Sequence, residues 1–283
     1  MLPADTHVHS EWSWDTGGPD SSAAGRMVAT CERAVKIGLT SLFFTEHLDL
    51  ETSWRASPED FPPWNARHID DDGYLSPPFL DVEGYFAALE ACRERFPSLS
   101  IGSGIEFGQP HLHERGASEL IDLSRFDRIL GSLHTLAIDH DVAEPITLYR
   151  HWEPHRVVRE YMIELESMAR QQRTATVITH LDYAIRSWPE ARVGPFDPAA
   201  FDVEIRAAMT AIAEAGLALE MNTRRLWPWM PRWWAECGGE LVTFGSDAHV
   251  PEALAHGFAD AAELLVESGF APRAAHTDPW ERR

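Results

Sequence analysis

Short apolar runs alternate along this chain with longer segments in which apolar residues recur at every third or fourth position. Short buried runs are typical of strands, and the longer period is typical of helices that pack one face on a core. The expected strands are residues 2–7, 40–45, 100–105, 128–132, 175–179, 218–221 and 240–244. The clearest helical segments are residues 22–37, 82–95, 154–171, 198–215 and 251–268.

Proline and glycine residues support several of the expected helix ends. Pro154, Pro198 and Pro251 each suit the first turn of a helix, where a missing N–H costs no hydrogen bond. Gly216 stands where a C-terminal cap belongs. The alternation of strands and helices predicts an α/β fold with a mostly parallel sheet. Seven such strands favour a closed barrel over an open sheet, and we expect residues 1–283 to form a single barrel domain.

Two segments lack this alternation. Residues at about 51–80 are rich in Pro, Asp and Trp without a clear period, and we interpret them as a long loop that overhangs the barrel mouth. Loops of that length in compact domains are usually functional or disordered. We interpret residues at about 270–283 as a peripheral tail.

The charge balance limits the partners that this chain can bind. It has 24 Lys and Arg residues against 45 Asp and Glu residues, which gives a formal net charge of −21. Such a surface repels nucleic acid and anionic membranes, so neither is an expected partner. A small phosphorylated metabolite would be repelled as well. Local cations, such as metal ions and one or two arginines, must therefore offset the global field around such a substrate.

The cysteine pattern and the N-terminal residues bear on location. Cys31, Cys92 and Cys237 are widely spaced and form no CxxC pair, which is not a disulfide framework and favours a reducing, cytoplasmic environment. The first ten residues lack a basic stretch followed by a long apolar run, and no run of about 18 apolar residues occurs. We therefore expect neither a signal peptide nor a membrane-spanning segment.

Histidines and acidic residues stand at or just after the end of almost every expected strand. They are His7, His9 and Asp15; Glu46 and His47; Glu106; His134; His180 and Asp182; and Asp247 and His249. The sixth strand leads instead to Asn222 and Arg224. The sites of such barrels are built at the carboxyl ends of the strands, because the loops that follow the strands converge there. One histidine at a strand end would be unremarkable, whereas the joint pattern predicts a metal centre.

The spacing within two of these groups has a physical reason. Residues i and i+2 of an extended strand point to the same side, so His7 and His9 are able to bind one ion together. Asp247 and His249 repeat the spacing after the last strand. Neutral imidazole suits zinc, iron and similar metals, and carboxylates are able to bridge two ions. We therefore expect two to three divalent transition metal ions, Zn, Fe or Mn.

The segments that carry these residues resemble motifs of the PHP (polymerase and histidinol phosphatase) superfamily, and most closely those of its monofunctional histidinol-phosphatase branch. In order, the segments are DTHVHSEWSWDT, FTEHLD, GIEFG, GSLHTL, THLDYAIR, LEMNTR and GSDAH, and they extend from residue 5 to residue 249. Members of that family form a distorted (β/α)7 TIM-like barrel with three metal ions. The resemblance implies the same fold here, with the metal site at the C-terminal ends of the strands.

The resemblance also implies a role for each matched residue. The first ion would be bound by His7, His9 and Asp247, and the second by His134 and His180. Glu106 would bridge these two ions. The third ion would be bound by Asp15, His47 and His249. Some PHP proteins have His where this chain has Asp15, and Asp favours the histidinol-phosphatase branch. Arg186 and Arg224 match the phosphate-binding arginines of the family. With Glu106 and Asp247, they would be the catalytic residues.

The expected function is hydrolysis of a small phosphate monoester, with L-histidinol phosphate as the first candidate substrate. The alternatives with related chemistry are a PHP phosphodiesterase and a phosphatase for another metabolite, such as a nucleotide. An amidohydrolase-type carbon–nitrogen hydrolase is a third hypothesis, but those barrels commonly use a lysine, and Lys36 is the only lysine and lies on an expected helix. The non-enzymatic alternative is a catalytically inactive metal-binding PHP-like module, which the complete ligand set disfavours.

Some assignments leave alternatives open. A two-metal site that does not use Asp15 and His47 is one of them. Glu46 and Asp182 are candidates for a carboxylate that accepts the second N–H of a ligand histidine. Arg225 could take the place of its neighbour Arg224.

Two further features stand out near the expected site. His111 and His113 form a second HxH after the third expected strand, and we expect them to lie outside the site. The chain also has 11 Trp residues, several of them close to the expected mouth. This abundance leaves the identity of the leaving group open, because aromatic side chains near the mouth would contact that part of a substrate.

Overall fold

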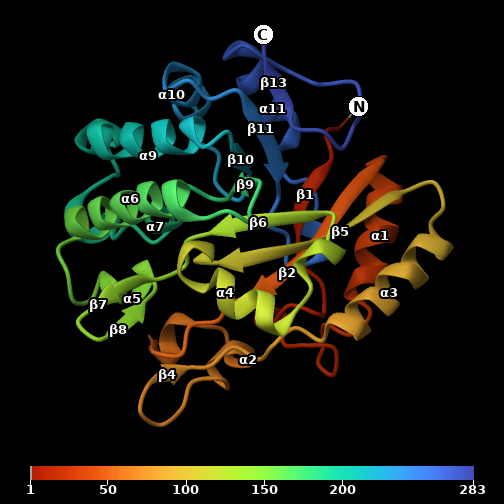
Figure 1. Ribbon diagram of the computed structural model, residues 1–283, viewed down its shortest axis with the longest axis horizontal. Helices are drawn as coiled ribbons and strands as arrows, with labels where there is room; N and C mark the ends of the chain where they lie inside the picture. The colour runs from red at the N-terminus through yellow and green to blue at the C-terminus, as the bar shows by residue number, and fades with distance from the viewer. Residues whose placement is uncertain (1) are drawn as a thin grey trace.

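The computed structural model describes residues 2–283 and has one large sheet of nine strands (Figure 1). The strand order is β1-β2-β5-β6-β9-β10-β11-β13-β12, and the first seven pair in parallel and in chain order. Those seven are β1 (Asp5–Val8), β2 (Ser41–Leu48), β5 (Ser100–Gly108), β6 (Arg128–Ser132), β9 (Val177–Ile178), β10 (Ala218–Asn222) and β11 (Leu241–Gly245). Strands β2 and β5 are buried along nearly their whole length, as parallel strands covered on both faces are.

The sheet curls so far that β1 lies beside β11. The Asp247 amide donates to the His7 carbonyl at 2.9 Å, and the His9 amide donates to the Ala248 carbonyl at 3.0 Å. Near its start, β11 pairs instead with the antiparallel strand β13 (Trp280–Arg282). The two ends of the parallel sheet therefore meet only at the carboxyl ends of the strands. The expected distorted seven-stranded barrel is confirmed, and its closure brings the first and last candidate ligand motifs together.

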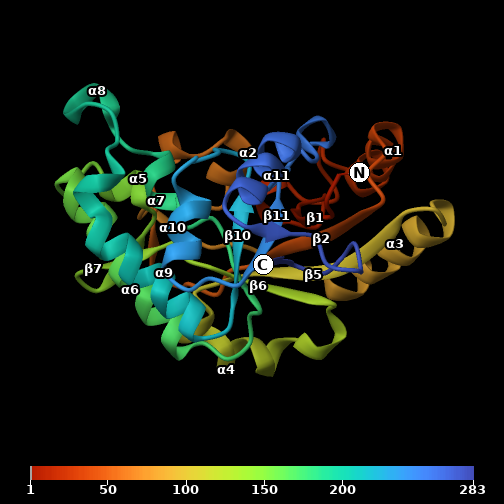
Figure 2. The ribbon, with the colours of Figure 1, turned by 90° about the horizontal axis from the view of Figure 1, so that it is seen from above.

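Helices cover the outside of the curled sheet (Figure 2). The longer ones are α1 (Arg26–Ile37), α3 (Val82–Arg95), α4 (Pro110–Leu120), α6 (Pro154–Gln171), α9 (Asp202–Glu214), α10 (Met230–Glu236) and α11 (Phe258–Glu267). The short ones are α2 (Pro63–Ala66), α5 (Pro145–Leu148), α7 (Tyr183–Arg186) and α8 (Glu190–Val193). Helices α3 and α6 have the predicted bounds. The predicted helices at 198–215 and 251–268 each begin with a 3-10 turn, Pro198–Phe201 and Pro251–Ala253.

The segment expected to be a long loop contains part of a second, small sheet. Its strands are β4 (Tyr74–Leu75), β3 (Trp54–Arg55), β8 (Asp141–Ala143) and β7 (Leu136–Ile138), in the order β4-β3-β8-β7. Figure 1 shows β4 below β7 and β8, away from the barrel strands. Trp54 and Leu75 are fully buried and pack with Trp14. The segment is therefore tied to the loop after β6, and it forms a structured wall over the barrel mouth.

The tail that we interpreted as peripheral extends the main sheet. Residues Phe270–Ala271 form β12, which pairs with β13, and β13 pairs with β11. The rings of Trp280 and Phe244 pack edge to face with centroids 4.9 Å apart. Most side chains between the two strands are exposed, but the strands themselves support β11. Among the helices of residues 2–283, none combines the length and the apolar character that crossing a membrane requires.

Candidate metal centre

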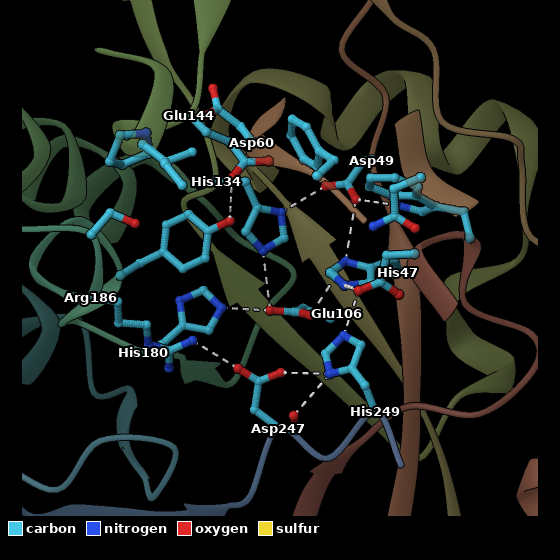
Figure 3. A pocket seen from close by; sticks show the side chains of 18 of the residues that line it. His47, Asp49, Asp60, Glu106, His134, Glu144, His180, Arg186, Asp247 and His249 are labelled. Carbon is cyan, nitrogen blue, oxygen red and sulfur yellow. Dashed lines mark hydrogen bonds and ion pairs between the residues drawn. The ribbon is translucent and has the colours of Figure 1, made fainter. Parts of the chain in front are cut away.

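Polar side chains from the ends of all seven parallel strands, or from the loops that follow them, meet around one pocket (Figure 3). Glu106, near the end of β5, is buried at the centre. Its two carboxylate oxygens lie 2.7–3.4 Å from ring nitrogens of five histidines, namely His7, His9, His47, His134 and His180. A carboxylate that faces imidazoles with both of its oxygens has the geometry that bridging two ions requires.

The first cluster consists of His7, His9, Glu106 and Asp247. The Nε2 atoms of the two histidines are 3.1 Å apart, and each lies 3.2 Å from Oε2 of Glu106. Asp247 Oδ1 lies 3.9 Å from His7 Nε2 and 3.6 Å from His9 Nε2. Four tetrahedral ligands at about 2.1 Å from an ion would be about 3.4 Å from one another. These four atoms therefore have the spacing of a four-coordinate site.

Hydrogen bonds on the far side of the two rings indicate which nitrogen carries the proton. His7 Nδ1 lies 2.6 Å from the buried Glu220 carboxylate, so this nitrogen is the donor. His9 Nδ1 lies 2.8 Å from Ser13 Oγ, which donates its own proton to Glu46 and accepts from His9. In the neutral rings, the two Nε2 lone pairs then face each other and the central carboxylate. An electron-rich point without a proton fits a cation, so the donor set suits a metal ion.

A second cluster forms around the other oxygen of Glu106. Oε1 lies 3.2 Å from His134 Nε2 and 2.7 Å from His180 Nε2. His134 Nδ1 lies 2.8 Å from the buried Asp49 carboxylate, so the His134 Nε2 lone pair faces Glu106. His47 Nδ1 lies 3.4 Å from Glu106 Oε2 and forms a further group with Glu106 and His134. The two sides of Glu106 thus face different sets of imidazoles.

The third cluster consists of His9, Asp15, His47 and His249, whose candidate ligand atoms all lie within 4.8 Å of one another. Asp15 Oδ2 lies 2.5 Å from His249 Nε2 and 3.5 Å from His47 Nε2. His249 Nδ1 donates to the Asp247 carbonyl at 2.9 Å, so its Nε2 lone pair faces Asp15. The His249 side chain is 26% exposed. This cluster is therefore the one that opens most onto the pocket.

The pKa shifts at the centre show how strongly its carboxylates and histidines interact. Burial would raise the pKa of Glu106, but the surrounding histidines, His7 first among them, hold the pKa well below its ordinary range. Burial would lower the pKa of His7, but Glu220 and Glu106 outweigh it and raise the pKa well above its usual value. Burial and the neighbouring imidazoles lower the pKa of His9 to about 3. Ionised carboxylates and neutral His9 together demand positive charge at this point.

Two backbone features place the ligands at the end of β11. A Cβ atom at Gly245 would lie 2.0 Å from Glu220 Oε1 and 2.7 Å from the His7 Cβ, so only glycine lets these side chains meet. Asp247 has a φ of 53°, in the left-handed region that non-glycine residues rarely occupy. Strain of this kind commonly accompanies a functional constraint. Here it accompanies the placement of the Asp247 carboxylate beside the His7 and His9 rings.

Two carboxylates that were candidate partners of ligand histidines have different positions. Glu46 contacts its histidine through Ser13, and burial raises the Glu46 pKa to about 7. Asp182, within the described residues, contacts no histidine. It lies 3.4 Å from Arg186 Nε and accepts from Trp227 Nε1 at 3.2 Å. Asp182 therefore belongs to the arginine side of the pocket.

Two carboxylates that contact candidate ligand histidines, Asp49 and Glu220, were missed by the sequence reasoning. Each lies inside a motif that the sequence analysis quoted. Asp49 follows His47 by two residues along an extended segment, and Glu220 is a charged residue within an otherwise apolar strand. These two positions were the sequence features from which a role beside the histidines could have been predicted. The second HxH lies outside the centre on α4, as expected, because His111 contacts Glu164 and His113 contacts Glu51, at 2.7 and 2.8 Å.

Arg186 points into the pocket from the end of α7. Its Nη1 donates to Asp247 Oδ2 at 2.9 Å, and its buried Nη2 has no hydrogen-bond partner within residues 2–283. Buried donors are normally satisfied, and an anionic group in the pocket would satisfy this one. Arg224 also lines the pocket, with Nη1 3.8 Å from Asp247, but its side chain is 59% exposed. Arg225 lies instead over the Trp227 ring at 4.2 Å.

A chain of contacts positions Arg186. Trp227 Nε1 donates to Asp182 Oδ2, and Asp182 Oδ1 lies 3.4 Å from Arg186 Nε. Arg186 then donates to Asp247. Trp227 belongs to a cluster of aromatic residues, and its ring centroid lies 5.5 Å from that of Phe196. Part of the tryptophan abundance thus supports the arginine rather than the leaving-group end of the pocket.

A cavity of about 400 Å³ lies over the three clusters. Its lining comprises Trp14, Asp15, His47, Asp49, Trp54, Asp60, Phe61, Asn65, Glu106, His134, Glu144, Pro145, Ile146, His180, Tyr183, Arg186, Ser187, Arg224, Asp247 and His249. Small-molecule sites commonly have volumes from about 300 to 1,000 Å³. The cavity therefore suits a ligand of metabolite size, with cationic arginines at one side and a wall from the small sheet at another.

Comparisons with known proteins bear on the family. A family model described as "PHP domain" matches residues 5–224. The histidinol-phosphatase of Lactococcus lactis subsp. lactis (strain IL1403) is 25% identical to this chain over 288 residues, which covers 95% of this chain and 93% of that protein. A Deinococcus radiodurans protein named "Probable histidinol-phosphatase" is 26% identical, and the match covers 94% of this chain and 93% of that protein.

Solved structures resemble the whole chain. The histidinol phosphate phosphatase of Lactococcus lactis subsp. lactis Il1403, in complex with zinc, L-histidinol and phosphate, matches with a TM-score of 0.71. That match covers 98% of both chains at 21% sequence identity. A structure from Listeria monocytogenes matches with a TM-score of 0.66 at 12% identity, over 91% of this chain and 99% of the other. At these identities the likeness shows a shared fold.

Proposed function

This chain belongs to the PHP domain family, and from that premise we propose that it hydrolyses L-histidinol phosphate to L-histidinol and phosphate. Relatives with histidinol-phosphatase names match it over most of their length, and support a phosphoric monoester hydrolase. The observation that carries the proposal is the convergence of three donor clusters beside Arg186, whose buried Nη2 has no hydrogen-bond partner among residues 2–283. Metal donors and an anion donor thus line one cavity.

The donor clusters would hold two to three divalent transition metal ions, Zn, Fe or Mn. The proposed ligands are His7, His9 and Asp247; Glu106 as the bridge, with His134 and His180; and Asp15, His47 and His249. Imidazole nitrogens and carboxylate oxygens are the donor types that suit these metals. When bound, such ions would lower the pKa of a water and neutralise charge on phosphoryl oxygens.

The protein's own contribution is to bind and orient the phosphate. The Arg186 guanidinium forms ion pairs with Asp182 through Nε and with Asp247 through Nη1, and this leaves Nη2 to donate to a phosphoryl oxygen. A planar guanidinium is able to form parallel hydrogen bonds to phosphate that an ammonium group cannot reproduce. Arg224 would close on the phosphate from the exposed side of the pocket. In a chain of net charge −21, these groups offset the repulsion of an anionic substrate.

Phosphate release by purified protein tests the proposal. The protein is treated with a chelator and then reloaded separately with Zn, Mn or Fe. The substrates are L-histidinol phosphate, a nucleoside monophosphate and the diester bis(p-nitrophenyl) phosphate. We expect metal-dependent turnover that is highest for L-histidinol phosphate. A preference for the diester or the nucleotide would replace the assignment with that alternative, and stoichiometric metal without turnover of any ester would support an inactive module.

A further inference from the structure

Glu144 lies at the end of the cavity away from Asp247 (Figure 3). It immediately precedes α5, but its side chain makes no capping hydrogen bond with that helix. Glu144 is 9% exposed, and its Oε2 accepts from the Tyr183 hydroxyl at 2.9 Å. Within residues 2–283, that is the only hydrogen bond that its carboxylate accepts. The second oxygen is therefore available to a molecule in the cavity.

The charge of Glu144 has no ion-pair partner among residues 2–283. Within the described chain, no arginine or lysine lies within ion-pair distance of its carboxylate. Asp60 lines the same cavity, but its negative charge is compensated, because it pairs with Arg150 and accepts from Thr147 Oγ1 at 3.0 Å. Burial raises the pKa of Glu144 to about 7. A buried carboxylate is costly unless a cation or several donors compensate it, and a ligand could supply that compensation.

The two ends of the cavity thus differ in charge. Arg186 and Arg224 stand beside Asp247, and their guanidinium groups suit an anion. Glu144 stands at the other end, beside the apolar side chains of Ile146 and Pro145. A ligand that fits both ends carries a phosphate, a short carbon skeleton and a protonated nitrogen.

Building on the function proposed above, we propose that Glu144 binds a protonated nitrogen of the leaving alcohol, so that the cavity selects phosphate esters of nitrogen-bearing alcohols over uncharged alkyl phosphates. The neutral Tyr183 hydroxyl fixes one oxygen of the carboxylate, and the other oxygen accepts the substrate N–H. A charge-assisted hydrogen bond in a buried site also discriminates against a ligand without the donor, because the carboxylate is then left unpaired.

Four esters built on the same propyl chain test the proposal: L-histidinol phosphate, 2-aminopropyl phosphate, 3-(imidazol-4-yl)propyl phosphate and propyl phosphate. In the zinc-loaded protein, Glu144→Gln should lower kcat/KM about ten- to hundredfold for the nitrogen-bearing esters that the parent prefers. The loss should arise mainly from KM. Propyl phosphate should be hydrolysed equally by both proteins. The two singly substituted esters distinguish the amino group from the imidazole as the bound nitrogen.

Two variants serve as controls. Glu153 is exposed, lies nine residues after Glu144 and makes no side-chain capping hydrogen bond with α6. Glu153→Gln should therefore leave kcat/KM unchanged for all four substrates. Glu144→Asp keeps the charge but withdraws it by one methylene, and should give an intermediate loss. An equal loss for propyl phosphate in Glu144→Gln, or unchanged kinetics for L-histidinol phosphate, would overturn the proposal.

Calorimetric binding of L-histidinol separates this proposal from the proposed activity. Binding to the zinc-loaded protein requires no turnover. If the parent protein hydrolyses no ester, the proposed activity fails, but about tenfold or greater weakening of L-histidinol binding in Glu144→Gln would still support the role of Glu144. Equal L-histidinol affinity in the two proteins, or no L-histidinol binding by the parent, would overturn it.

Discussion

At the scale of single residues, the hydrogen bond at Nδ1 of a histidine determines whether Nε2 presents a lone pair to a metal ion. Glu220 and Asp49 each accept from the Nδ1 of a candidate ligand histidine, so in the neutral ring the Nε2 lone pair is directed at Glu106. Carboxylates in this position also raise the basicity of the ring. The centre is therefore defined as much by these two carboxylates as by the histidines themselves.

Replacing the central carboxylate should remove both metal and activity. In Glu106→Gln, an amide N–H would face imidazole nitrogens that now face carboxylate oxygens, so we expect at least one ion per chain to be lost together with turnover. Elemental analysis and phosphate release measure the two effects. Glu164→Gln, which removes a carboxylate paired with His111 outside the centre, is the matched control and should keep both. A folded Glu106→Gln protein with normal metal content and activity would contradict the bridging role.

Removing the Arg186 guanidinium should separate substrate binding from metal binding. Arg186→Ala should keep its metal and lose kcat/KM by roughly thirty- to a thousandfold, on the order of 2–4 kcal/mol. Arg224→Ala should lose less, because its side chain is 59% exposed and water screens it. Arg225→Ala, whose guanidinium stacks on Trp227, is the control. Near-normal kcat/KM in Arg186→Ala for every phosphomonoester would mean that arginine does not bind the phosphate.

The residues that sequence reasoning found are recognisable from local sequence patterns, whereas those that it missed depend on the packing of distant segments. His7 and His9 are recognisable from their spacing on one strand. Glu220 acquires its role only because β1 lies beside β11, which is next to β10, and no local pattern states that arrangement. Glu144 follows a strand of three residues in the small sheet, outside all seven expected strands. The convergence of the candidate ligands was therefore predictable, whereas partners that depend on distant packing were not.

At the scale of elements, long segments were predictable and short ones were not. The seven barrel strands are apolar runs between turn residues, and α6 has a clear helical period. Strands of the small sheet are two or three residues long, so they have no period to detect. Helix α4 was not among the expected helices, and of its residues only Pro110 and Ala117 are buried.

The loop after β10 should influence phosphate binding through one hydrogen bond. Trp227→Phe removes the N–H that donates to Asp182, which in turn positions Arg186, so we expect kcat/KM to fall about three- to tenfold and inhibition by phosphate to weaken. Trp229→Phe is a matched control, because Trp229 Nε1 has no hydrogen-bond partner in the described chain and its ring lies 6.0 Å from that of Trp227. Equal kinetics and phosphate inhibition in the two variants would refute a positioning role for Trp227.

At the scale of the whole molecule, the metal centre joins distant parts of a strongly acidic chain. The convergent carboxylates of Glu106, Asp15 and Asp247 repel one another unless cations stand between them. The net charge of −21 adds to this repulsion over the molecule as a whole. Bound ions should therefore stabilise the fold as well as support activity.

Removal of the ions should lower thermal stability. A ligand present at about a thousand times its Kd contributes about 4 kcal/mol, so chelation should lower Tm by about 10 °C for a chain of this size. Thermal unfolding followed by circular dichroism measures the shift, and adding back zinc should reverse it. The Tm of Glu106→Gln should respond much less to the chelator. Identical Tm values for chelated and zinc-loaded parent protein would show that the centre does not contribute to stability.

The meeting of β1 and β11 has a consequence for the order of folding events. The Thr6 hydroxyl donates to the Phe244 carbonyl at 2.9 Å across 238 positions of sequence separation. Neighbouring strands along the chain pair over much shorter loops, and contacts between distant segments form more slowly because more loop entropy is lost. The pairing of His7 and His9 with Asp247 should therefore be among the last steps of refolding. Until it occurs, the first cluster lacks a ligand, so the kinetics of ion uptake would report barrel closure.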